Sequence, residues 1–69
     1  MVEVFKTNIR DKMTAHIVTA HLYEHFPGGK INFDLEDCDK ILRVESDKVH
    51  PNEVTKILTH KGYLCEVLE

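Results

Sequence analysis

The sequence has no tryptophan, two cysteines, two prolines, three glycines and no block of basic residues. Cys38 and Cys65 are too few for a disulfide framework, so both thiols are expected to be free in a reducing compartment. The nine lysines and arginines are scattered and the formal net charge is -3, which argues against electrostatic binding of nucleic acid.

Long apolar runs are also missing, since none approaches the roughly 18 residues of a membrane-spanning helix. The first residues, MVEVFKTNIR, lack a basic segment followed by an apolar one, so no signal peptide is expected. These absences predict a cytoplasmic protein that makes no contact with a membrane.

The remaining composition is typical of a globular protein, with 42% hydrophobic and 30% charged residues. A chain of 69 residues is expected to form one domain, 1–69, with one small core. Such a domain buries only about 60% of the surface of its unfolded chain, so it often gains stability from a partner.

Periodicity predicts four strands and two helices. Stretches that alternate between apolar and polar residues, as strands do, are residues 2–9, 30–37, 40–46 and 63–68. Helical spacing marks residues 12–26, which Asp11 is expected to cap and Pro27 to end, and residues 51–61, which begin at Pro51.

The resulting order is βαββαβ. Because βα crossovers are right-handed, the expected fold is α+β and ferredoxin-like, with both helices on one face of a four-stranded antiparallel sheet. Its expected strand order is 4-1-3-2. This topology brings three connections to one end of the sheet: residues 8–11, the hairpin around Cys38, and the turn at residues 60–62.

Three stretches resemble the heavy-metal-associated domains, which include copper chaperones and the N-terminal modules of metal ATPases. FPGGKINFDLED is similar to that family's helix end and second strand, KILRVES to its third strand, and ILTHKGYLCEVL to its second helix and last strand. In that family the loop after the first strand carries Met-x-Cys-x-x-Cys, whose thiolates hold soft cations such as Cu(I) or Zn(II).

The equivalent stretch here, NIRDKMTAH, contains no cysteine. Lys12 and Ala15 fall near the family's two cysteine positions, and neither is a soft ligand. Ile9 or Met13 is expected to stand in for the loop methionine, which packs into the core in that family. The resemblance therefore implies the fold, whereas no metal or other cofactor is expected at this loop.

A non-standard metal site is the alternative. His21 and His25 lie four residues apart on the predicted first helix and share a face that can bind Zn(II), Ni(II) or Cu(II), although real sites need three or four ligands. Cys38 is expected to be exposed on the hairpin, and Cys65 to point inward as a small hydrophobic residue. With these residues the chain would be a metal-binding or metal-transport protein that holds a transition metal ion.

Enzymatic motifs are absent from the sequence. No nucleophile is grouped with a histidine and an acid, and no glycine-rich phosphate loop occurs. The acidic run DLEDCD lacks the glycine turn of a calcium loop. We therefore expect a protein that is not an enzyme.

Apolar residues of the first helix form two stripes on nearly opposite sides. One stripe contains Ala15, Val18, Thr19, Leu22 and Phe26, and the other contains Met13, Ile17 and Ala20. A helix on a sheet buries one face, and the resemblance places Leu22 and Phe26 in the core, so Met13 and Ile17 are expected to be exposed.

The open face of the sheet is expected to carry further apolar residues: Val2, Val4, Ile41, Leu64 and Leu68. Together with Met13 and Ile17, these residues are candidates for an interface, because contiguous exposed apolar patches mark sites of protein contact. The sequence thus predicts a metal-independent interaction module that binds a protein partner or forms a homo-oligomer.

Overall fold

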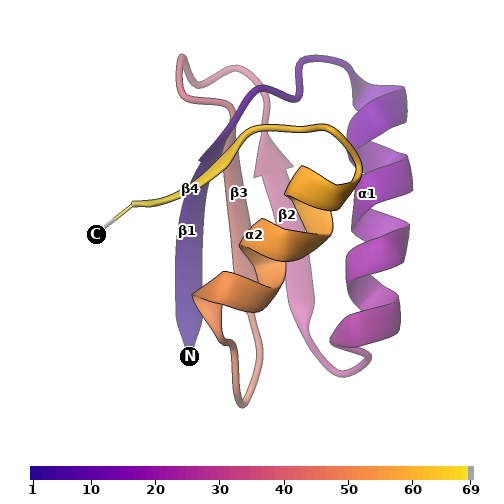
Figure 1. Ribbon diagram of the computed structural model, residues 1–69, viewed down its shortest axis with the longest axis vertical. Coiled ribbons are helices and arrows are strands. Elements are labelled where there is room, and N and C mark those ends of the chain that lie inside the picture. The colour runs from indigo at the N-terminus through magenta and orange to yellow at the C-terminus, as the bar shows by residue number, and fades with distance from the viewer. Residues whose placement is uncertain (69) are drawn as a thin grey trace.

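A computed structural model describes residues 1–68 as an α+β arrangement of four strands and two helices (Figure 1). The elements follow in the order β1 (Val2–Thr7), α1 (Lys12–His25), β2 (Lys30–Asp34), β3 (Ile41–Glu45), α2 (Pro51–His60) and β4 (Cys65–Leu68). Neither helix is long and apolar enough, within these residues, to cross a membrane.

The strands form one antiparallel sheet in the order β2-β3-β1-β4. Read from the β4 edge, this is the order 4-1-3-2 that the sequence predicts. The register places Phe5 of β1 between Leu42 of β3 and Val67 of β4, with Phe33 of β2 beyond Leu42. These side chains pack with both helices in one core, so α1 and α2 cover the same face of the sheet (Figure 1).

Local signals in the sequence set the ends of α1. Asp11 is the N-cap: its carboxylate accepts hydrogen bonds from the Thr14 N–H at 3.0 Å and the Thr14 hydroxyl at 2.8 Å. Both hydrogen bonds lower the pKa of the Asp11 carboxyl below its ordinary value, and the bond from the Thr14 hydroxyl has the larger effect. At the other end, the Phe26 N–H bonds to the Leu22 carbonyl at 2.9 Å and Pro27 follows, so the helix ends where it was predicted to end.

The second helix begins at Pro51, whose missing N–H costs nothing in a first helical turn. It ends before Gly62, which has a φ of +92°. That conformation is natural for glycine and strained for other residues. Val54 and Leu58 are completely buried, as the helical spacing predicts.

All four strands are shorter than predicted. β1 ends at Thr7 rather than at residue 9, and β3 lacks residues 40 and 46. β2 ends at Asp34 rather than at residue 37, because the chain turns there: the Lys40 N–H bonds to the Asp37 carbonyl at 3.0 Å. β4 begins at Cys65, so Tyr63 and Leu64 precede it. Strand ends follow from turn hydrogen bonds, which alternation alone does not encode.

Ile9, rather than Met13, is the residue that packs into the core beside the loop after β1. Its side chain is 1% exposed, whereas that of Met13 is 74% exposed. Val49, just before α2, is another core residue and is 2% exposed, although no periodic pattern predicts it. Both residues lie in connections, where pattern reading has no period to follow.

A candidate interaction surface on α1 and the β2 edge

The exposed stripe of α1, formed by Met13, Ile17 and Ala20, lies on the side of the helix away from the sheet. All three residues are exposed, Ile17 by 53%. The opposite stripe of α1 is buried at Ala15, Val18 and Leu22. The predicted division of the helix into a core face and an exposed apolar face is therefore confirmed.

A groove of about 640 Å³ runs between α1 and β2, which is an edge strand of the sheet. One wall comes from α1, through Lys12, Ala15, His16 and Thr19, and the other comes from residues 32–36. The sequence alone did not reveal this groove, because it depends on how far the helix stands from the strand. Helical spacing does put Lys12, His16 and Thr19 on one side of α1.

Tyr23 ties α1 to the edge of β2. Its hydroxyl oxygen accepts a hydrogen bond from the Ile31 backbone N–H at 3.2 Å. The Tyr23 ring is nevertheless 40% exposed. Sequence reasoning did not single out this residue, although it shares the groove side of α1 with Thr19, four residues earlier.

The alternation of residues 30–37 predicts that Phe33 points inward as a core residue, and this prediction is correct only in part. Its side chain is half-buried: it packs against the core and also lines the groove. The reason is its strand, since β2 lies at the edge of the sheet and has a neighbour only in β3.

The interface candidates on the open face of the sheet differ in how exposed they are. Val2 is 54% exposed and Val4 is half-buried. Ile41 is only 6% exposed and is therefore not an accessible interface residue; β3 is a central strand, where Lys6 and Asp34 flank Ile41 on both sides. Leu64 is 44% exposed but lies before β4, with its N–H bonded to Asn8 Oδ1 at 2.9 Å.

The histidines are not gathered into a three-ligand site. His21 Nδ1 lies 3.8 Å from Glu24 Oε2, and His25 is exposed at the end of α1. Within residues 1–68, the only group of three or more metal-ligating side chains is Asp37, Cys38 and Asp39. His21 and His25 thus have no third ligand that the structure brings to them.

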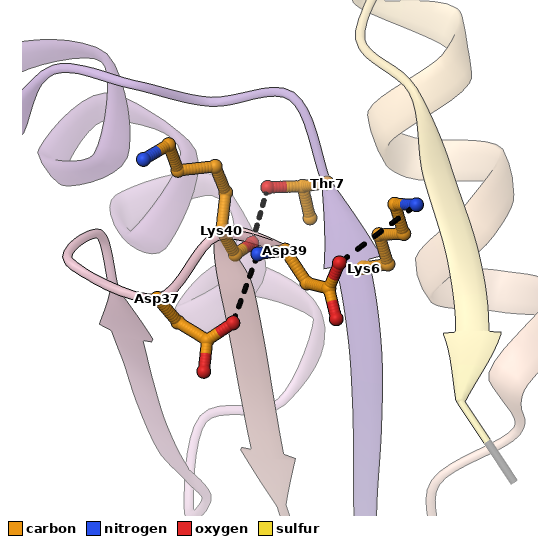
Figure 2. A network of polar contacts seen from close by, with 5 residues as sticks. All are labelled: Lys6, Thr7, Asp37, Asp39 and Lys40. Atoms are coloured by element: carbon orange, nitrogen blue, oxygen red, sulfur yellow. Dashed lines mark hydrogen bonds and ion pairs between the residues drawn. The ribbon is translucent and has the colours of Figure 1, made fainter.

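The hairpin group of Asp37, Cys38 and Asp39 has ligand atoms within 4.8 Å of one another. Its carboxylates already have partners in the chain (Figure 2). Asp37 Oδ1 accepts the Asp39 N–H at 2.8 Å, and Asp39 Oδ1 lies 3.8 Å from Lys6 Nζ. These contacts shape the turn, so the arrangement is explained without a metal ion; Cys38 is exposed beside them, as predicted.

Thr7 joins the end of β1 to the hairpin (Figure 2). Its hydroxyl donates to the Lys40 carbonyl at 2.6 Å and accepts the Ile9 N–H at 3.2 Å, while its own N–H donates to the Asp39 carbonyl. Thr7 is the buried polar residue of the core, 4% exposed. Lys40 adopts a φ of +48°, which is uncommon outside glycine. These hydrogen bonds join the loop after β1 to the β2–β3 hairpin, two of the connections that the sequence predicts at this end of the sheet.

Cys65 points inward, as predicted, and is 6% exposed. Burial raises the pKa of its thiol from the ordinary value of 9.0 to about 11, against the opposing hydrogen bond from Thr55. The thiol is therefore neutral and shielded at physiological pH, and it is poorly suited to bind a metal ion.

This raised pKa predicts that the folded chain loses stability as the pH rises from 9 to 11. In that window the folded state keeps a thiol proton that the unfolded state has lost, so increasing pH favours unfolding. Urea denaturation at several pH values should show a steeper loss for the wild type than for Cys65→Ala, in which other titrating groups are unchanged. Equal slopes would show that the thiol ionises alike in both states.

Comparisons of the chain with protein-family models, with curated proteins and with solved structures found no match.

Proposed function

We propose that this chain is a non-enzymatic protein-interaction module that works without a metal ion. The observation that carries the proposal is the exposed stripe of α1, where Met13 is 74% and Ile17 53% exposed. The same helix buries Leu22 completely, so the exposed residues do not result from a helix that lacks a core face.

Energetics support a role in contact for the exposed stripe of α1. Full burial of a large apolar side chain is worth roughly 1.5–3 kcal/mol, and the total stability of a domain of this size is about 3–10 kcal/mol. Covering Met13 and Ile17 with a partner would therefore contribute a free energy that is a large fraction of the stability of the domain. Residues that flank the stripe on its groove side, Lys12 and His16, supply a polar rim of the kind that interfaces have.

Ile17→Lys is expected to leave the fold intact and to abolish partner contact. A photo-crosslinking amino acid at Ala20, beside the stripe on the same helix, should capture a protein in cells that make the chain. The same probe at Lys56, an exposed position on α2, is the matched control. Capture at Ala20 that Ile17→Lys removes supports the proposal, while equal capture at both positions, or unfolding by Ile17→Lys, contradicts it.

We also propose that the fold is ferredoxin-like and that it resembles the heavy-metal-associated domains in architecture. The alternation of strands and helices and the central placement of β1 and β3 support this proposal. A cytoplasmic location fits the two free thiols, of which Cys38 is exposed.

The resemblance predicts a gain of function. In the double variant Lys12→Cys and Ala15→Cys, two thiolates one helical turn apart should bind Zn(II) or Cu(I), because these positions correspond to the family's ligands. The wild type, with no thiol between residues 1 and 37, should show no such binding at this loop. Metal titration with a competing chelator measures both, and each single variant is a control. A folded double variant without affinity for either ion would argue against the alignment.

A further inference from the structure

We infer that the groove between α1 and β2 binds a free L-α-amino acid with an apolar side chain, which pairs with the backbone of Phe33 like a strand one residue long. The groove has a volume of about 640 Å³, within the range of roughly 300–1,000 Å³ that is typical of small-molecule sites. It lies on a different side of α1 from the exposed stripe, so the inference goes beyond the proposed function and can fail without it.

The backbone of Phe33 faces the groove. Ile31 donates its N–H to the Tyr23 hydroxyl oxygen on α1, so this residue turns its N–H away from β3. Because residues along an antiparallel ladder alternate, Phe33 also directs its N–H and its carbonyl away from β3, to the side on which the groove lies. No turn, cap or side-chain hydrogen bond within residues 1–68 uses either group. Phe33 thus offers a ligand one donor and one acceptor.

The backbone on both sides of Phe33 is already occupied. The Ile31 N–H is held by Tyr23 at 3.2 Å, and the Leu35 carbonyl accepts from Lys40 Nζ at 2.9 Å. A longer strand beside β2 would therefore meet Tyr23 at one end and Lys40 at the other. A single residue fits between them, and a free amino acid has the groups it needs: its ammonium donates to the Phe33 carbonyl while its carboxylate accepts the Phe33 N–H.

The spacing of side chains on α1 explains why space is left beside Phe33. The helix and β2 run in opposite directions (Figure 1), so Thr19, one turn before Tyr23, stands level with Phe33. Tyr23 is long enough to reach the strand, whereas Thr19 is not, and the helical wall of the groove extends from Thr19 toward the start of α1. Ala15, a further turn away, is also small. These short side chains leave room for the side chain of a ligand.

An L-amino acid that pairs with Phe33 in this way places its side chain in the groove. Opposite side chains of an antiparallel pair lie on the same face, and that of Phe33 is on the helix side, where it is half-buried. The ligand side chain therefore lies next to the Phe33 ring and to Ala15 and Leu35, the other apolar residues of the lining. A D-amino acid with the same backbone hydrogen bonds would direct its side chain to the open face of the sheet instead.

The amino side of Phe33, where the ligand carboxylate lies, carries hydrogen-bond donors and a positive charge. Asn32 precedes Phe33, and Arg43 is its partner on β3, with Nη1 donating to Asn32 Oδ1 at 3.5 Å. Both residues line the groove, as does the hydroxyl-bearing Thr19 on the opposite wall. A carboxylate bound here gains a charge-assisted contact with the guanidinium group.

The carbonyl side of Phe33, where the ligand ammonium lies, is acidic. Asp34 and Glu36 line the groove from this side, and Lys12 lines it from the first turn of α1. Within residues 1–68, no ion pair joins Lys12 to either carboxylate, and neither carboxylate pairs with another cation. Two carboxylates against one ammonium leave this end negative. The groove therefore has charges of opposite sign at its two ends, as a zwitterion requires.

An NMR titration with L-phenylalanine tests the inference. Saturable shifts of the Phe33 and Thr19 amide signals are expected at ligand concentrations up to about 10 mM. N-acetyl-L-phenylalanine, which lacks the ammonium, and L-phenylalaninamide, which lacks the carboxylate, should each bind roughly tenfold more weakly, and so should D-phenylalanine. The absence of saturable shifts with L-phenylalanine, shifts confined to other residues, or equal binding of the D enantiomer would overturn the inference.

Arg43→Glu and Arg10→Glu are matched variants for the carboxylate end of the groove. Both arginines are exposed and both substitutions change the net charge equally, but only Arg43 lines the groove. Arg43→Glu should weaken binding of L-phenylalanine roughly tenfold, and Arg10→Glu should leave it unchanged. Circular dichroism checks that both variants fold. Equal affinities of the two variants would contradict the site.

Thr19→Tyr tests the groove itself, because a second tyrosine one turn before Tyr23 should fill the space beside Phe33 and abolish binding. If this variant is folded and binds L-phenylalanine like the wild type, the site is wrong; if it does not fold, Arg43→Glu decides. Ile17→Lys separates this inference from the proposed function, since it changes the exposed stripe of α1 and should bind L-phenylalanine with wild-type affinity.

Discussion

Leu22→Ala is expected to lower the free energy of unfolding by about 2–5 kcal/mol, the range for truncating a fully buried leucine. Leu22 is 0% exposed and lies on the core face of α1 one helical turn after Val18, which is also fully buried. In a domain with about 3–10 kcal/mol of total stability, this loss removes a large share of that stability. Urea denaturation followed by circular dichroism measures the change.

Ile17→Ala is the matched control for Leu22→Ala, because it truncates a similar aliphatic side chain on the same helix. Ile17 is 53% exposed, so its truncation should change stability by no more than about 0.5 kcal/mol. Equal losses from Leu22→Ala and Ile17→Ala would mean that the faces of α1 are assigned wrongly. A small loss from both would mean that α1 contributes little to the core.

The faces of the helices were predictable from the sequence, because helical spacing separates residues that share a side. That spacing separates Ala15, Val18 and Leu22 from Met13 and Ile17, but it does not decide which stripe is buried. The resemblance to the heavy-metal-associated domains placed Leu22 in the core, and Ala15, Val18 and Leu22 are buried. Alternation likewise predicted every strand. It failed at the strand ends, because the turn that stops β2 at Asp34 depends on hydrogen bonds between side chains and backbone.

The errors in the predicted burial of Phe33 and Ile41 arise from the position of each strand in the sheet. Alternation assigns Phe33 to the core face and Ile41 to the open face, and both assignments of face are correct. Phe33 is nevertheless half-buried because β2 is an edge strand, and Ile41 is buried because β3 is central. Periodicity reports the direction of a side chain, whereas its exposure also depends on neighbouring strands.

The groove and the hydrogen bond between Tyr23 and β2 could not be predicted from periodicity. They depend on contacts between segments that lie apart in the sequence, such as Tyr23 with Ile31. Lys40, whose own φ is +48°, likewise donates from its Nζ to the Leu35 carbonyl across the turn.

Thr7→Val should lower the free energy of unfolding by about 1–3 kcal/mol, although valine has nearly the same shape as threonine. The hydroxyl bridges the Lys40 carbonyl and the N–H of Ile9, which is 1% exposed, so valine leaves two backbone groups without this partner in a place that water hardly reaches. Hydrogen exchange at the Ile9 amide should become faster, since that N–H loses its acceptor. Denaturation in urea gives the change in stability.

Thr7→Ser separates the hydroxyl from the methyl group of Thr7. Serine keeps both hydrogen bonds and gives up one methyl group, a loss of about 0.8 kcal/mol, so it should be less destabilising than valine and should retain slow exchange at Ile9. The opposite order would show that Thr7 acts through packing alone. With the predicted order, a single hydroxyl joins β1, the hairpin at Lys40 and the loop before α1.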